Sequence, residues 1–175
     1  MAHNYPWYNV VESQDNLNQG DFLDKCPIII PPDDITLNIT YEVKVKRYNV
    51  IILSQSCDLI QKKLDLVLVC PVYSLEYYGE RDTQFKKSKG KEKLRRGEIV
   101  GYHLLGKCEL HGLEKDYQVV DFRSVFSIPF ESITGFAKKQ GKRLRLLPPY
   151  REHLSQAFAR FFMRVGLPID IPSFI

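Results

Sequence analysis

The stretch YNVIILSQSCDLIQKKLDLVLVCPVYSL, residues 48–75, decides how the rest of the chain can fold. Two apolar runs within it, residues 49–53 and 64–70, are rich in β-branched side chains and shorter than typical helices. They therefore predict two strands that lie next to each other in one sheet. Because each run is apolar almost without interruption, we expect both faces of these strands to be covered, as at the centre of a sheet.

Five polar or reactive side chains lie in the predicted loop between these strands: Ser54, Gln55, Ser56, Cys57 and Asp58. Polar groups on a loop that is held by buried strands are a common way to build a functional site. Ser and Asp also occur in simple turns, because their side chains hydrogen-bond to nearby backbone groups. The sequence leaves both interpretations open, a site and a capped turn.

The bulk composition indicates an ordinary globular protein. A length of 175 residues predicts a single domain, residues 1–175, and the hydrophobic content of 44% is enough for a real core. No run approaches the ~20 apolar residues that cross a bilayer, and residues 1–16 do not resemble a signal peptide. The four cysteines are scattered and form no CxxC pair. We therefore expect a reduced, cytoplasmic protein with no membrane contact, no metal and no cofactor.

The positive charge is concentrated in one segment. The whole chain has a net charge of +4, whereas residues 81–96 contain eight Lys or Arg and two carboxylates, a net charge of +6. A second group of cations lies between residues 138 and 145. This asymmetry favours a polyanionic partner. Residues 79–97 are rich in Lys, Gly and Ser, and we predict an inserted, mobile basic loop there; a solvated loop with no partner is the alternative.

Strands dominate the rest of the predicted structure, after an N-terminal arm at residues 1–16. Pro148 and Pro149 suit the start of a helix at residues 148–166, in which an aromatic stripe faces the sheet. The predicted class is therefore mainly β with α. The further strands are predicted at residues 26–30, 35–40, 41–46, 98–105, 107–110 and 117–127, with a connection at 129–133, and the helical stripe consists of Leu154, Phe158, Phe161, Phe162 and Val165.

The order of several short motifs resembles the MazF/PemK (Kid-like) toxin family, whose members are small SH3-like barrels with helical additions. Residues 20–22 (GDF) are similar to the opening turn and strand of the family, and residues 46–54 resemble its "RPVLVLS" motif. Residues 67–74 resemble "VVVPVTS", residues 119–125 resemble the later strand that carries a conserved Asp, and residues 141–148 resemble the "GKRL…P" run. The resemblance implies an SH3-like (MazF/PemK-type) β-barrel with a C-terminal helix.

The resemblance also implies an activity, because this family cleaves single-stranded RNA without a metal. Such cleavage needs a base for the 2′-hydroxyl, a cation for the phosphate and an acid for the leaving oxygen. Asp121 and Arg123 are two residues apart on a predicted strand, so we expect both side chains on one face. The expected catalytic residues are Asp121, Arg123, Ser54 and Asp58. The expected substrate-binding residues are Arg47, Gln55, Ser56, Ser74, Lys86, Lys87, Arg95 and Arg96.

Two departures from the family pattern keep other functions open. Val119 stands where Kid-like members have an Arg, and Tyr73 stands where they have a Thr. One alternative is an inactive barrel that acts as a protein-interaction module or partner-inhibited regulator in a bacterial stress or phage-defence system. Another is a nucleic-acid-binding module that uses the basic segments. The partners expected are RNA, a protein such as an antitoxin or a defence-complex subunit, and a second copy in a homodimer.

Two further chemistries involve cysteine and histidine. Cys57 could form a nucleophile pair with His103 or His111. The three residues His103, Cys108 and His111 could bind zinc together with Cys57 or Cys70. Neither set has the local spacing that is typical of such sites, so both are weaker hypotheses.

Overall fold

The computed structural model of the protein describes residues 5–34 and 40–163. It is a mixed α/β protein in which the strands pair antiparallel, in agreement with the predicted combination of sheet and helices. The strands are β1 (Tyr8–Val11), β2 (Phe22–Ile30), β3 (Lys44–Ile52), β4 (Leu66–Ser74), β5 (Tyr102–Leu105), β6 (Gln118–Asp121), β7 (Phe126–Pro129) and β8 (Arg143–Leu146). The helices are α1 (Ser56–Ile60), α2 (Leu75–Arg81), the short 3-10 helix η1 (Thr83–Phe85), α3 (Ser88–Arg95), α4 (Phe130–Gln140) and α5 (Tyr150–Phe162).

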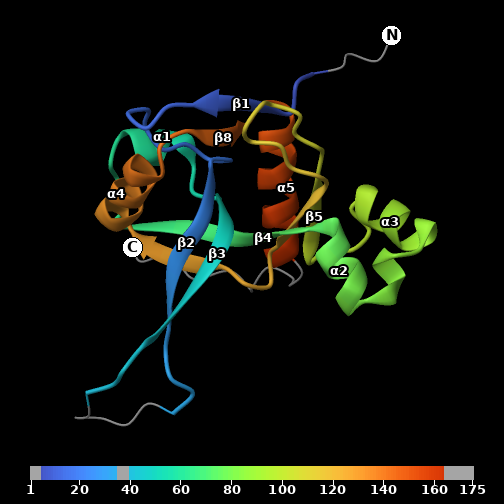
Figure 1. The fold of residues 1–175 in the computed structure, drawn as a ribbon, viewed down its shortest axis with the longest axis horizontal. Helices are drawn as coiled ribbons and strands as arrows, with labels where there is room; N and C mark the ends of the chain where they lie inside the picture. The colour runs from blue at the N-terminus through green and yellow to red at the C-terminus, as the bar shows by residue number, and fades with distance from the viewer. Residues whose placement is uncertain (1–4, 35–39, 164–175) are drawn as a thin grey trace, which may run out of the picture.

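Strand β4 organises the larger of two sheets (Figure 1). The order in this sheet is β2-β3-β4-β6-β5, and β7 also pairs with β4. The first half of β4 pairs with β7 and its second half pairs with β6, while β1 and β8 form a separate two-stranded sheet. Among the described residues these strands do not close into a barrel, so the closed SH3-like barrel that the sequence predicts is not observed.

The predicted pair of central strands is confirmed. Strands β3 and β4 are adjacent and antiparallel, with Val50 opposite Pro71. Val50, Ile51 and Ile52 are fully buried. Ile51 packs in one apolar core and its two neighbours pack in a second core, so both faces of β3 are covered here. Each such side chain stabilises the fold by about 1.5–3 kcal/mol.

The ends of this central region differ from the prediction. Leu66 and Leu68 on β4 are partly exposed and only the alternate residues there are buried, so one face of this half of β4 is open. The prediction of a loop at residues 54–58 is wrong for residues 56–58, which form the beginning of the short helix α1. Leu59 explains this helix, because it packs in the second core together with Val67 and Val69.

The prediction of an inserted basic loop at residues 79–97 is wrong. This segment contains the end of α2, the turn η1 and helix α3. Phe85 and Leu94 are buried together with Tyr78 and Val119 in a third apolar cluster. Gly90 does not add flexibility here, because a Cβ at this position would lie 1.8 Å from the carbonyl oxygen of Gln84. The glycine permits close packing of α3 on η1.

Three other sequence predictions need correction. The N-terminal arm at residues 1–16 contains β1, which pairs with β8; residues 1–4 lie outside the described residues. The long strand at 117–127 is two strands, β6 and β7, with a turn between them. Most of the connection predicted at residues 129–133 belongs to helix α4, which covers Phe130–Gln140. The shorter predicted strands also differ. Strand β5 covers only part of the strand predicted at 98–105, and the strand predicted at 107–110 is reduced to one isolated bridge at Cys108. Of the strands predicted at 35–40 and 41–46, the second is observed only from Lys44, where β3 begins, and residues 35–39 lie outside the described part.

The C-terminal helix is confirmed as α5. Leu154 is fully buried, and Phe158 and Phe161 contact Phe122 of the first core. Phe162 is mostly exposed, and the predicted stripe residue Val165 lies outside the described residues. Helix α5 has 13 residues, and no helix in the described part of the chain could span a bilayer.

A buried ion network joins the two sheets. The carboxylate of Asp21, immediately before β2, accepts hydrogen bonds from Arg143 and Arg145 of β8. The side chains of Asp21 and Arg143 are completely buried, and Arg143 also donates to the carbonyl oxygens of Glu12 and Asp15. Part of the second cationic group in the sequence is therefore structural.

Candidate nucleic-acid interface

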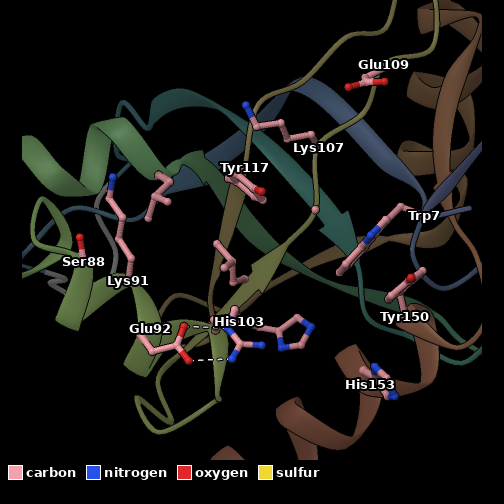
Figure 2. A pocket seen from close by; sticks show the side chains of 14 residues that line it. Trp7, Ser88, Lys91, Glu92, His103, Lys107, Glu109, Tyr117, Tyr150 and His153 are labelled. Atoms are coloured by element: carbon pink, nitrogen blue, oxygen red, sulfur yellow. Dashed lines mark hydrogen bonds and ion pairs between the residues drawn. The ribbon is translucent and has the colours of Figure 1, made fainter. Parts of the chain in front are cut away.

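A cleft of about 880 Å³ lies between α3, β5 and the start of α5 (Figure 2). Figure 2 shows side chains from these three elements and from residue 7 around one space, with Lys91 and Glu92 on one side and Tyr150 and His153 on the other. The polar and aromatic side chains that line it are Trp7, Ser88, Lys91, Glu92, Arg95, His103, Lys107, Glu109, Tyr117, Tyr150 and His153.

A stacked aromatic pair forms one wall of the cleft. The rings of Trp7 and Tyr150 are parallel, with centroids 3.6 Å apart and an interplanar angle of 8°. Trp7 precedes β1 and its carbonyl oxygen accepts a hydrogen bond from Leu147, which fixes it beside β8. The Trp7 ring lies against Gly106, where a Cβ would come within 2.5 Å of it. Gly106 therefore provides the space in which this wall is built.

Cations from two elements reach the rim of the cleft. Lys91 and Arg95 are exposed on α3, and Lys107 follows β5. Arg95 pairs with Glu92, and hydrogen bonds from Arg95 and Arg96 lower the pKa of Glu92 to about 2. Lys107 pairs with Asp116 at 2.9 Å and its ammonium lies 5.1 Å from the centroid of the Tyr117 ring. Exposed ion pairs of this kind contribute little to the stability of the fold, so Arg95 and Lys107 can exchange their carboxylate partners for phosphate groups at little cost.

Two imidazoles line the same cleft. His103 of β5 is half-buried and stacks on Phe122, with ring centroids 6.3 Å apart. Burial lowers the pKa of His103 to about 4, and the nearby His153 contributes to this shift. His103 is therefore neutral at pH 7 and can accept a proton or a hydrogen bond through one ring nitrogen. His153 is exposed on α5, and its ring meets the edge of Tyr150 at 6.2 Å.

The predicted catalytic residues Asp121 and Arg123 meet outside this cleft. Both oxygens of the Asp121 carboxylate accept from the Arg123 guanidinium at 2.9 Å, and one also accepts from the Tyr78 hydroxyl at 3.0 Å. Arg123 lies in the turn after β6, not on the same strand as Asp121 as predicted, and its guanidinium covers the ring of Tyr102. Burial and the contact with Asp121 raise the pKa of Tyr78, which keeps its hydroxyl a donor. This arrangement fixes the turn.

The structure places the predicted loop residues elsewhere. The Ser54 hydroxyl is buried and accepts from the backbone N–H of Leu68, so it belongs to the β3–β4 connection. Asp58 lies in the first turn of α1. Gln55 and Ser56 line a separate cavity of about 420 Å³ against α5, together with Cys57. None of these residues lines the cleft of Figure 2.

The predicted substrate-binding residues are dispersed. Arg95 lines the main cleft, and Lys86 lines a neighbouring cavity of about 470 Å³ that shares Lys91 and Lys107 with it. The Ser74 hydroxyl instead caps α2, where it accepts from the backbone N–H of Tyr77. Of the remaining three, Arg47 lies on the β2–β3 hairpin, Lys87 precedes α3, and Arg96 pairs with Glu92.

Sequence reasoning missed Trp7, Lys107, Tyr150 and His153 as site residues, and it considered His103 only for a Cys–His pair or a zinc site. They come from positions far apart in the chain, and each is unremarkable in its local sequence. The one usable signal is the basic segment, which supplies Lys91 and Arg95 to the rim.

Neither cysteine hypothesis gains support from the geometry. Cys57 is exposed, whereas Cys70 and Cys108 are buried. Burial raises the pKa of Cys70 to about 12, which keeps it a neutral thiol. In residues 5–34 and 40–163, no group of three His, Cys, Asp or Glu side chains is arranged to hold a metal ion.

The cleft thus combines side chains that bind phosphate with side chains that stack on bases. Lysine and arginine are suited to the first, and the aromatic rings of Trp and Tyr are suited to the second. No known protein family, curated protein or solved structure matches the chain.

Proposed function

We propose that this protein binds single-stranded RNA in the cleft between α3, β5 and α5. One observation carries the proposal: a stacked Trp7–Tyr150 pair and the cations Lys91, Arg95 and Lys107 surround one open space of about 880 Å³. Proteins that bind single strands combine a positively charged groove with aromatic platforms on which bases stack. Bases of a single strand are free to stack in this way, whereas those of a duplex are not.

We also propose that the chain is a MazF/PemK-like protein of a bacterial toxin or defence system, with an open form of the SH3-like barrel. The order of the sequence motifs supports this, and so do the β3–β4 pair and the C-terminal helix α5. In this proposal the inserted segment at residues 79–97 forms one side of the RNA cleft. The RNA site then differs from the expected one, because neither Asp121 nor Arg123 lines the cleft.

Fluorescence anisotropy of a labelled single-stranded RNA, measured over a range of salt concentrations, tests RNA binding. We expect Lys91→Ala to weaken binding. The slope of the logarithm of the binding constant against the logarithm of the salt concentration should become smaller in magnitude by about 0.7, the contribution of one phosphate contact in a single strand. Lys139→Ala is the matched control, because Lys139 is exposed and does not line the cleft, and its helix α4 lies on the other side of the molecule from α3 (Figure 1). Equal effects of the two substitutions, or binding that does not depend on salt, would contradict the proposal.

The β2–β3 hairpin favours a second function, docking of a protein partner. Its distal part projects from the body of the molecule (Figure 1), and Ile29, Val43 and Val45 on it are at least half exposed. Exposed apolar side chains that cluster on one projection are typical of interaction sites. The proposed partner is an antitoxin-like protein or a defence-complex subunit, with a second copy of the chain as the alternative.

Co-expression with the product of the adjacent gene tests this second function. A partner that docks on the hairpin should co-purify with the wild-type protein and be lost with Val45→Asp, whereas Lys139→Asp should retain it. Sedimentation of the isolated wild-type protein and of Val45→Asp separates a homodimer from a heterologous complex. A partner that binds both proteins equally would place the interface elsewhere.

A further inference from the structure

We infer that His103 and His153 act as a base and an acid that cleave the bound RNA strand. The inference rests on the proposed function, because the two imidazoles line the same cleft that is proposed to hold the RNA. It extends that function from binding to chemistry, and it assigns the chemistry to residues other than Asp121 and Arg123.

Rigid elements hold the two imidazoles near each other in the cleft. His103 is on β5 and stacks on Phe122, which in turn contacts Phe158 and Phe161 of α5. His153 is on that same helix, one turn after its first residue. These contacts fix the spacing between strand and helix, and Figure 2 shows both rings at the cleft. Such placement on packed secondary structure gives the precision that acid–base chemistry needs.

The electrostatics of the cleft give the two imidazoles different roles. His103 is neutral above its lowered pKa of about 4, so it can accept a proton. A proton on His153 disfavours a second proton on His103, because the two groups interact. His103 is therefore assigned as the base, and His153, the other imidazole that lines the cleft, is assigned as the acid. The other charged and titratable groups that face the cleft are Lys91, Glu92 and Arg95 from α3, Lys107 and Glu109 after β5, Tyr117 before β6, and Tyr150 from α5.

The reaction is an internal transfer of the RNA phosphodiester. The neutral ring nitrogen of His103 takes the proton of the ribose 2′-hydroxyl, and the 2′-oxygen forms a bond to phosphorus. The bond from phosphorus to the 5′-oxygen of the next nucleotide breaks, and this oxygen takes the proton of His153. Arg95, which lines the same cleft, is assigned to stabilise the extra negative charge on the phosphate oxygens. The products are a 2′,3′-cyclic phosphate end and a 5′-hydroxyl end, and the step consumes no other reactant.

The test uses single-stranded RNA with a 5′ label, from which the cyclic phosphate product is identified by mass spectrometry. We expect the wild-type protein to produce it, and His103→Gln or His153→Gln to slow cleavage at least about a hundredfold. Both variants should bind RNA within about threefold of the wild type, because phosphate contacts provide most of the affinity. His111→Gln, a change at a fully exposed His outside the cleft, is the matched control and should cleave normally.

A second substrate separates the chemistry from binding. An oligonucleotide with 2′-deoxyribose at every position should bind to the cleft and remain intact, because it has no attacking hydroxyl. If the wild-type protein binds RNA but produces no cyclic phosphate, or if His103→Gln cleaves as fast as the wild type, the inference is overturned and the proposed binding function stands. If no single-stranded RNA binds, both are overturned. Circular dichroism of each variant checks that it is folded.

Discussion

His103 shows how one residue can combine a packing role and a chemical role. Its ring packs on Phe122 as an aromatic side chain, and the same burial lowers its pKa to about 4. A folded-state pKa below the ordinary value of 6.5 means that the unfolded chain binds a proton which the folded protein does not bind. The residue therefore links folding to pH.

This linkage predicts a specific loss of stability in acid. The contribution of His103 to the free energy of unfolding is fully present above pH 6.5 and falls as the pH drops through the window from 6.5 to about 4. We expect a loss of about 1–3 kcal/mol from this residue. Urea unfolding at pH 7 and pH 4.5 should show a smaller loss for His103→Gln than for the wild type. His111→Gln should behave as the wild type, and equal losses in all three proteins would refute the linkage.

The two residues of the Asp121–Arg123 ion pair are predicted to contribute unequally to the free energy of unfolding. The Arg123 side chain is 56% exposed, so Arg123→Ala should lower the free energy of unfolding by only about 0–1 kcal/mol. Asp121 accepts from the buried Tyr78 hydroxyl, so Asp121→Ala should cost more, about 1–3 kcal/mol. Chemical denaturation of the two variants measures this difference. RNA affinity should be unchanged in Arg123→Ala, because Arg123 does not line the cleft; a large loss of affinity would return Arg123 to the RNA site.

Helix α3 is the element on which the cleft depends most, and the sequence predicts it incorrectly. A count of Lys, Gly and Ser indicates a loop, because these residues bury little apolar surface. Two side chains, Phe85 and Leu94, are nevertheless enough to anchor the segment against Val119, and Gly90 allows the close approach. Composition averages over residues, whereas packing depends on a few of them at the right spacing.

Two glycine substitutions test this account of α3. Alanine normally stabilises a helix relative to glycine by up to about 1 kcal/mol. Gly135→Ala in α4 should show this gain, because a Cβ there meets nothing within 4 Å. Gly90→Ala in α3 should instead destabilise the protein, because the new Cβ would lie 1.8 Å from the Gln84 carbonyl oxygen. Thermal unfolding measures both, and a stabilising Gly90→Ala would show that α3 is not packed on η1.

At the scale of the whole molecule, the buried Asp21–Arg143 pair joins the β1–β8 sheet to β2. Removing one partner of a buried ion pair leaves an uncompensated charge and costs about 3–5 kcal/mol. We therefore expect Arg143→Ala to lower the melting temperature strongly. For a chain of this size, each kcal/mol lost from the free energy of unfolding lowers the melting temperature by about 2–4 °C. Lys142→Ala, an exposed neighbour that pairs with Glu12, should change it little. Similar small shifts in both would mean that the network does not hold the sheets together.

The sequence predicts the centre of this molecule better than its site. The strands β3 and β4 and the helix α5 follow from apolar runs and a helical stripe, which are local signals. The cleft is built from β1–β8 pairing, the packing of α3 and the start of α5, which bring Trp7, Lys91 and His153 together. No local pattern marks these residues, because their proximity arises only from the tertiary fold.

Trp7 provides the most direct measurement of whether RNA occupies the cleft. It is the only tryptophan in the chain and it forms a wall of the cleft, so its fluorescence reports on that site alone. Titration with single-stranded RNA should quench Trp7 emission in a saturable way, with the same dissociation constant that anisotropy gives, and Lys91→Ala should shift both curves to higher RNA concentration. RNA that binds by anisotropy without changing Trp7 emission, or RNA that does not bind at all, would contradict the assignment of this cleft.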